Sequence, residues 1–82
     1  MEGFAYRGHF VRVDPDGKGD HWEPHIGVEV HAKGSVETIW YRDPEHVYPT
    51  REAAAEACVA FGKRMIDDFT VPGVGEGDLK TS

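Results

Sequence analysis

The residues best suited to chemistry are histidines, of which the 82-residue chain has five. Several stand at alternate positions of one extended stretch, where side chains two residues apart share a face. The imidazole and carboxylate groups on that face are His21, Glu23, His25, Glu29 and His31. A tetrahedral zinc site needs three or four converging ligands, whereas neighbours on one face of a strand stand about 6.5 Å or more apart. We therefore interpret this face as solvated.

A metal site is the alternative interpretation of the same face. Its ligands would be drawn from His21, His25, His31 and Glu29. Such a site also requires a ligand from a neighbouring strand, for which His9 is available.

Catalytic chemistries find little support in the sequence. Cys58 is the single cysteine and falls on the apolar stripe of a helix, so we expect it to be a buried hydrophobic group rather than a nucleophile. The acidic turn 14–20 has a partial calcium-loop spacing, but Lys18 and His25 occupy positions where such a loop needs oxygen ligands. No glycine-rich phosphate motif joins a strand to a helix. We expect no enzymatic activity and no cofactor.

The composition bounds the possible partners. The chain is 39% hydrophobic and 29% charged, which is typical of a globular protein. Its net charge of -6 makes nucleic acid an unlikely partner, because affinity for phosphates rests on clustered lysine and arginine. No apolar run is long enough to span a membrane, and the first ten residues lack the layout of a signal peptide. The expected location is therefore the cytoplasm.

The element that organises the chain is a helix predicted over residues 50–69. Its apolar stripe consists of Ala54, Ala57, Cys58, Phe61, Met65 and Phe69, with Val59 and Ile66 on the flank. Thr50 is the expected N-cap, because its hydroxyl can accept a hydrogen bond from a first-turn amide. Gly62 costs about 1 kcal/mol relative to alanine within a helix. Its presence indicates a close approach to a flat partner such as a sheet.

Three strands are predicted before this helix. Residues 4–13, 21–32 and 36–42 are rich in β-branched and aromatic residues, and the turns 14–20 and 33–35 separate them. The second strand alternates most clearly between apolar and polar residues. Its apolar face, which we expect to meet the helix, carries Trp22, Ile26, Val28, Val30 and Ala32.

The predicted fold is an α+β domain over residues 1–70. It is a three-stranded antiparallel β-meander with one long C-terminal α-helix packed on one face, followed by a flexible tail at 71–82. One helix covers only one face of a sheet. Aromatic residues of the first and third strands are the candidate partner-binding residues of the uncovered face: Tyr6, Phe10, Trp40 and Tyr41. Such a face, or a free strand edge, predicts a homodimer or another protein partner, with base stacking in a nucleic-acid regulator as the alternative.

Several short motifs resemble those of a known group of proteins. They are Tyr6-Arg7-Gly8, Pro15, Gly19, Trp22, Arg42-Asp43, Thr50 and the RMID segment at 64–67. Over about residues 6–67 the chain resembles small uncharacterised bacterial proteins with a β-β-β-α layout, a domain of unknown function. Some similar families carry the label of transcriptional activators of haemolysin expression. The resemblance implies a β-β-β-α fold and, through that label, an association with DNA.

Overall fold

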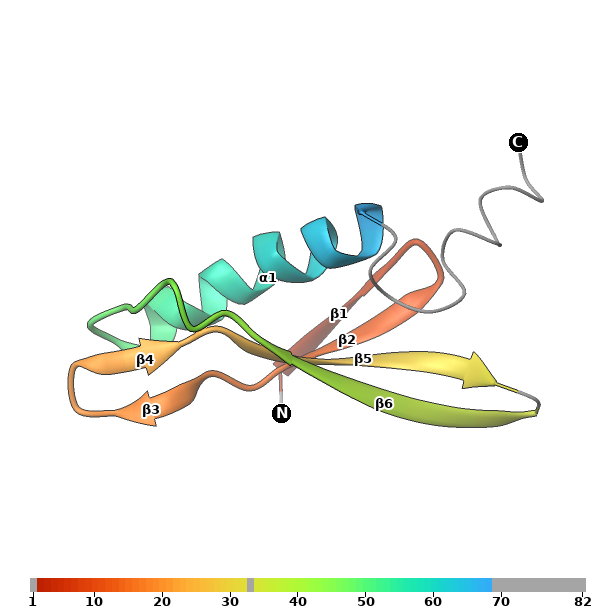
Figure 1. The fold of residues 1–82 in the computed structure, drawn as a ribbon, viewed down its shortest axis with the longest axis horizontal. Helices are drawn as coiled ribbons and strands as arrows, with labels where there is room; N and C mark the ends of the chain where they lie inside the picture. The colour runs from red at the N-terminus through yellow and green to blue at the C-terminus, as the bar shows by residue number, and fades with distance from the viewer. Residues whose placement is uncertain (1, 33, 69–82) are drawn as a thin grey trace.

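The computed structural model describes residues 2–32 and 34–68. Its elements in chain order are β1 (Glu2–Tyr6), β2 (His9–Val13), β3 (Asp16–Lys18), β4 (His21–Glu23), β5 (His25–Ala32), β6 (Ser35–Arg42) and α1 (Arg51–Asp67). A four-stranded antiparallel sheet has the order β1-β2-β5-β6, and β3 and β4 form a separate antiparallel pair. The helix lies along one side of the strands (Figure 1). The predicted tail at 71–82 and Phe69 lie outside the described residues.

The first predicted strand, residues 4–13, is a hairpin. β1 and β2 pair antiparallel and are joined by Arg7 and Gly8, whose φ angles are 49° and 84°. A two-residue turn with positive φ at both positions matches the twist of paired strands. Because arginine rarely adopts positive φ, the sequence gives no sign of a turn at this position. The three-stranded meander is therefore wrong, whereas the α+β class with one helix on an antiparallel sheet is confirmed.

A second long hairpin is interrupted by two prolines. The register of β2 on β5 continues into that of β3 on β4, which places Pro15 opposite Pro24. The amide of Asp14 donates to the carbonyl of His25 at 3.0 Å, so the Pro15–Pro24 pair falls at a non-hydrogen-bonded position, where the strands divide into two sheets. The turn predicted at 14–20 narrows to Gly19 and Asp20, between β3 and β4.

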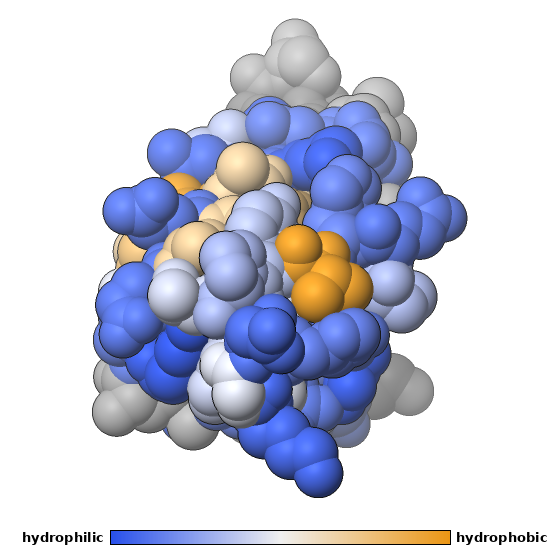
Figure 2. Space-filling model, turned by 90° about the vertical axis from the view of Figure 1, so that its left-hand side faces the viewer, coloured by the Kyte–Doolittle hydropathy of each residue, from blue (hydrophilic) through white to orange (hydrophobic). Residues whose placement is uncertain are grey.

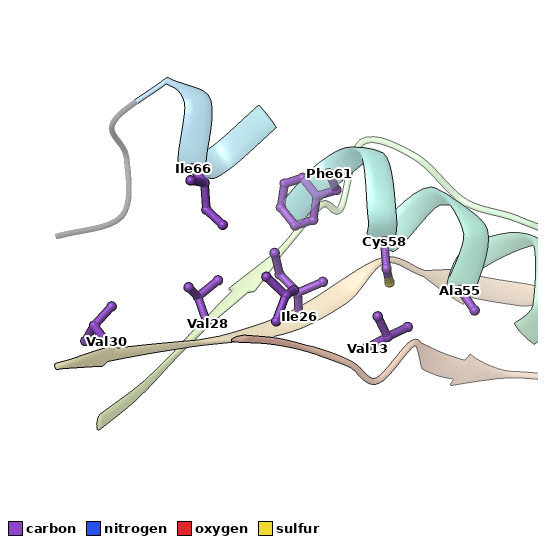
Figure 3. Close-up of a cluster of buried hydrophobic side chains, with 9 residues drawn as sticks. Val13, Ile26, Val28, Val30, Ala55, Cys58, Phe61 and Ile66 are labelled. Carbon is purple, nitrogen blue, oxygen red and sulfur yellow. The ribbon is translucent and has the colours of Figure 1, made fainter. Parts of the chain in front are cut away.

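The hydrophobic core lies between α1 and the sheet, where side chains of the helix and the strands point toward one another (Figure 3). The buried apolar side chains are Val11, Val13, Ile26, Val28 and Val30 from the strands, and Ala54, Ala55, Cys58, Phe61 and Ile66 from the helix. The predicted inward face of the second strand is thus confirmed at three of these positions. The helix is rotated slightly from the predicted stripe, because Ile66 is fully buried while Met65 is only half-buried.

The two predicted special positions of the helix are confirmed. The hydroxyl of Thr50 accepts a hydrogen bond of 3.1 Å from the amide of Ala53, as an N-cap does. Gly62 faces the β1–β2 hairpin, and a Cβ atom added there would lie 3.1 Å from Phe4 and 3.2 Å from Val11. The missing side chain lets the helix backbone approach the sheet closely.

Candidate protein-interaction surface

The sheet face opposite α1 carries exposed apolar groups. Strand alternation, counted from the buried positions, assigns its side chains on three strands. These residues, which we call the open face, are Phe10, Arg12, His25, Gly27, Glu29, His31, Val36, Thr38, Trp40 and Arg42. Phe10, Val36 and Trp40 are 43%, 55% and 45% exposed, which makes them three of the five large hydrophobic residues exposed in the described chain. The open face is therefore the main apolar surface of the described residues.

Two aromatic rings of the open face lie over glycines of neighbouring strands. A Cβ atom added to Gly3 would lie 2.5 Å from the ring of Phe10, and one added to Gly27 would lie 2.8 Å from the ring of Trp40. Trp40 also stacks on His25, with ring centroids 4.8 Å apart and an interplanar angle of 18°. Both rings are thus held in place while remaining exposed.

The arginines of the open face are paired with carboxylates. Nη2 of Arg12 lies 2.7 Å from Glu29. Arg42 lies 2.6 Å from Asp16 and 3.2 Å from Glu23, which ties β6 to the β3–β4 hairpin. Such exposed pairs contribute little to stability. They matter for the choice of partner, because the phosphate groups of a nucleic acid would have to compete with these carboxylates for the arginines.

The four aromatic residues predicted to bind a partner are divided between the two faces. Phe10 and Trp40 lie on the open face, whereas Tyr6 and Tyr41 are half-buried and pack against the core on the helix side. The β1–β2 turn separates Tyr6 from Phe10, because Tyr6 is paired with His9 and the alternation restarts after the turn. Tyr41 is separated from Trp40 because neighbouring residues of one strand point to opposite faces. The structure therefore brings Phe10 and Trp40 to one surface and places the two tyrosines elsewhere.

A polar cluster joins the β1–β2 turn to the end of the helix. The hydroxyl of Tyr6 donates to both carboxylate oxygens of Asp67, at 2.9 and 3.0 Å, and Nη1 of Arg7 donates to the same group at 2.9 Å. Hydrogen bonds from Arg7 and Tyr6 lower the pKa of Asp67, and the bond to Asp67 raises the pKa of Tyr6. One feature of the sequence points to this cluster. An aspartate in the last turn of a helix opposes the helix dipole, which a cationic partner offsets.

Replacing Asp67 should make stability less sensitive to acid. The folded-state pKa of this carboxyl is lowered, so its contribution is present above the ordinary value near pH 4 and is lost as the pH falls through the lowered pKa. We expect Asp67→Asn to lower the thermal midpoint at neutral pH and the two midpoints to converge as the pH falls through the lowered pKa of the Asp67 carboxyl. Thermal unfolding followed by circular dichroism at several pH values measures this.

The adjacent residue supplies the control for that experiment. Asp68 carries the same charge at the same helix end, but its side chain is not part of the cluster. Asp68→Asn should leave the midpoint nearly unchanged at every pH. If Asp67→Asn instead follows the wild type throughout, the cluster has no stabilising role.

The histidines are spread over several surroundings. His25 and His31 lie on the open face of β5 with Glu29, whereas His21 is on β4 in the separate two-stranded sheet. His9 is on the helix side, with Nδ1 3.1 Å from the carbonyl oxygen of Glu29. Within residues 2–32 and 34–68, no group of three or more histidine, cysteine, aspartate or glutamate side chains could hold a metal ion.

Cys58 is buried, as expected. Its side chain is 0% exposed, and Sγ donates to the carbonyl oxygen of His25 at 3.6 Å. Burial raises the pKa of the thiol, which favours the protonated form over the nucleophilic thiolate. The residue therefore acts as a core side chain.

Two other surfaces are less suited to a partner. A groove between β1 and the start of α1 has Phe4, Val13 and Ala55 in its apolar lining, but its rim is charged and includes Arg51 at 2.8 Å from Glu2. The end of the molecule formed by the β3–β4 hairpin is mostly hydrophilic, with one compact hydrophobic patch and a separate area of moderate hydropathy (Figure 2). Neither surface combines ordered aromatic rings with a free strand edge.

No helix of the described chain is both long and apolar enough to cross a membrane. Comparison with protein-family models, with curated proteins and with solved structures found no match. The open face and the strand that borders it are therefore the basis for assigning a function.

Proposed function

We propose that this chain is a non-enzymatic binding module that self-associates through its open face and the adjoining edge of β6. The observation that carries the proposal is the seating of Phe10 and Trp40 over glycines, which orders two exposed rings. Ordered side chains lose little conformational entropy on binding, and tryptophan is among the residues that dominate interface energies.

The charges of this surface favour a protein over a nucleic acid. Arg12 and Arg42, the arginines of the open face, are paired with carboxylates. The chain as a whole has a net charge of -6, which repels phosphate groups. A surface with paired charges around ordered aromatic rings is suited to another protein surface of similar character.

Size-exclusion chromatography with light scattering tests the proposal. We expect a dimer at high micromolar concentration that dissociates on dilution. Trp40→Ala should weaken the association at least about tenfold, because a central aromatic residue contributes more than 1.4 kcal/mol. Val47→Ala is the matched control, since Val47 is also 45% exposed but lies outside the open face. A wild-type protein that stays monomeric at high micromolar concentration would remove self-association from the proposal.

A titration with a fluorescent single-stranded oligonucleotide at low salt distinguishes the nucleic-acid alternative. We expect no change in anisotropy. A salt-dependent rise in anisotropy would favour nucleic acid as the partner and overturn the assignment of a protein partner.

A further inference from the structure

The outer side of β6 is a strand edge that no other strand of the described residues pairs with. Among the described residues β6 pairs with β5 alone, along all eight of its residues and without a bulge. Proteins commonly protect such an edge with proline, lysine or a bulge, because its free amide and carbonyl groups recruit other strands. The sequence of β6, SVETIWYR, has neither proline nor lysine and is rich in β-branched and aromatic residues. It is well suited to pairing with another strand.

The hydrogen bonds of the β5–β6 ladder determine which groups face outward. The amide of Asp43 donates to the carbonyl of Pro24 at 3.0 Å, so this pair is of the hydrogen-bonded type. Pairs alternate along an antiparallel ladder. The residues whose amide and carbonyl groups point away from β5 are therefore Val36, Thr38, Trp40 and Arg42.

The opposite edge of the sheet, β1, has fewer outward-pointing backbone groups with which another strand could pair. β1 has five residues, and the two-residue turn that follows it makes Tyr6 and His9 a hydrogen-bonded pair. Outward-pointing backbone groups on β1 are therefore those of Gly3 and Ala5. Glu2, at the start of β1, is also tied to Arg51 of the helix.

We propose that β6 pairs antiparallel with β6 of a second copy of this chain, with a two-fold axis through Ile39. This inference rests on the proposed function, because it specifies the part of the contact that the edge of β6 makes. It places Trp40 opposite the second copy's Thr38 and leaves Phe10, two strands away on β2, outside the contact. The two four-stranded sheets become one continuous sheet, and about eight backbone hydrogen bonds cross the interface, two for each hydrogen-bonded pair. The contact is isologous and closes at two copies.

Charge and strand length select this register. Outward-facing residues must pair with one another, so the axis passes through a residue near the middle of β6. An axis at Trp40 places Glu37 opposite the partner's Asp43, which repels, and an axis at Thr38 places Arg42 opposite the β5–β6 turn. With the axis at Ile39, Glu37 meets the partner's Tyr41, whose hydroxyl can donate to the carboxylate.

The position of the helix agrees with this arrangement. α1 packs on β2, β4 and β5, so the helix side of β6 is less well covered. Ile39 and Tyr41 are half-buried there. The two-fold axis places the two Ile39 side chains next to each other, which buries apolar surface on the helix side of both copies.

A proline scan of the two edges tests the proposal in the full chain. Thr38→Pro removes an outward amide that plays no part in the β5–β6 ladder, so we expect a folded monomer at concentrations where the wild type is a dimer. Ala5→Pro, the matched change on the outer side of β1, should leave the dimer intact. A Thr38→Pro dimer overturns the edge pairing while the proposed function stands, whereas a monomeric wild type overturns both.

Cysteine cross-linking tests the register without proline. Ile39 lies on the axis in a non-hydrogen-bonded pair, where Cα atoms are about 4.5 Å apart, within the range that a disulfide spans. We expect Ile39→Cys to form a covalent dimer with a copper–phenanthroline oxidant. Glu37→Cys, on the same side of β6 but facing the partner's Tyr41, should not. Equal cross-linking of the two variants, or none of either, overturns the register.

Discussion

Ile26→Ala is expected to lower the free energy of unfolding by about 3 to 4 kcal/mol. The side chain is 0% exposed and lies at the centre of the core, on the strand that runs through the middle of the sheet. It reaches the helix at Gly62, where its Cδ1 atom would lie 3.6 Å from an added Cβ. A domain of this size has a total stability of only about 4 to 10 kcal/mol, so the truncation removes a large fraction of it.

Urea denaturation followed by circular dichroism measures this effect. Ile26→Val keeps most of the side chain and should cost about 0.5 to 1.5 kcal/mol. Val59→Ala, on the exposed side of α1, should stay within about 0.5 kcal/mol of the wild type. If Ile26→Ala costs no more than Val59→Ala, the core is not centred on β5.

Gly62→Leu should destabilise the protein by about 2 to 3 kcal/mol, although leucine is the better helix former by nearly 1 kcal/mol. Even a single Cβ atom would be close to Phe4 and Val11, and Val11 is fully buried and has no room to move. The larger side chain therefore forces the helix away from the β1–β2 hairpin. We expect the thermal midpoint to fall by about 4 to 8 °C for each kcal/mol.

Ala60→Leu provides the comparison on the same helix. Ala60 is exposed, so the change adds a side chain of the same size to solvent. Its midpoint should remain close to that of the wild type. A Gly62→Leu protein with the same midpoint as Ala60→Leu would show that the helix does not meet the sheet at Gly62.

The parts of the fold that depend on local pattern could be predicted from the sequence. The helix period, the cap at Thr50 and the alternation at Ile26, Val28 and Val30 are properties of neighbouring residues. The split of the first strand could not be found in this way, because Arg7 has no preference for positive φ. The interruption of the second hairpin is also non-local, since the position of Pro15 opposite Pro24 depends on the register between two strands.

The candidate surface was predictable to a smaller extent. A sheet with one helix layer leaves a face uncovered, and Trp40 and Phe10 lie there. The seats of these rings on Gly3 and Gly27 depend on the register between strands, which the sequence alone does not set. Tyr6 lies on the other surface because the two-residue turn before His9 reverses the alternation of faces relative to a single continuous strand.

The facing prolines of the second hairpin mark the boundary between the four-stranded sheet, which carries the core, and the β3–β4 hairpin. The Asp14–His25 hydrogen bond adjoins this boundary on the sheet side, and the β3–β4 hairpin is also held by contacts with other segments. These are the backbone bonds between Trp22 and Tyr48, at 2.8 and 2.9 Å, and the ion pairs of Arg42. The turn at Gly19 and Asp20 lies at the end of this hairpin that is farthest along the chain from the core strands, which makes it a tolerant position for insertions or fusions.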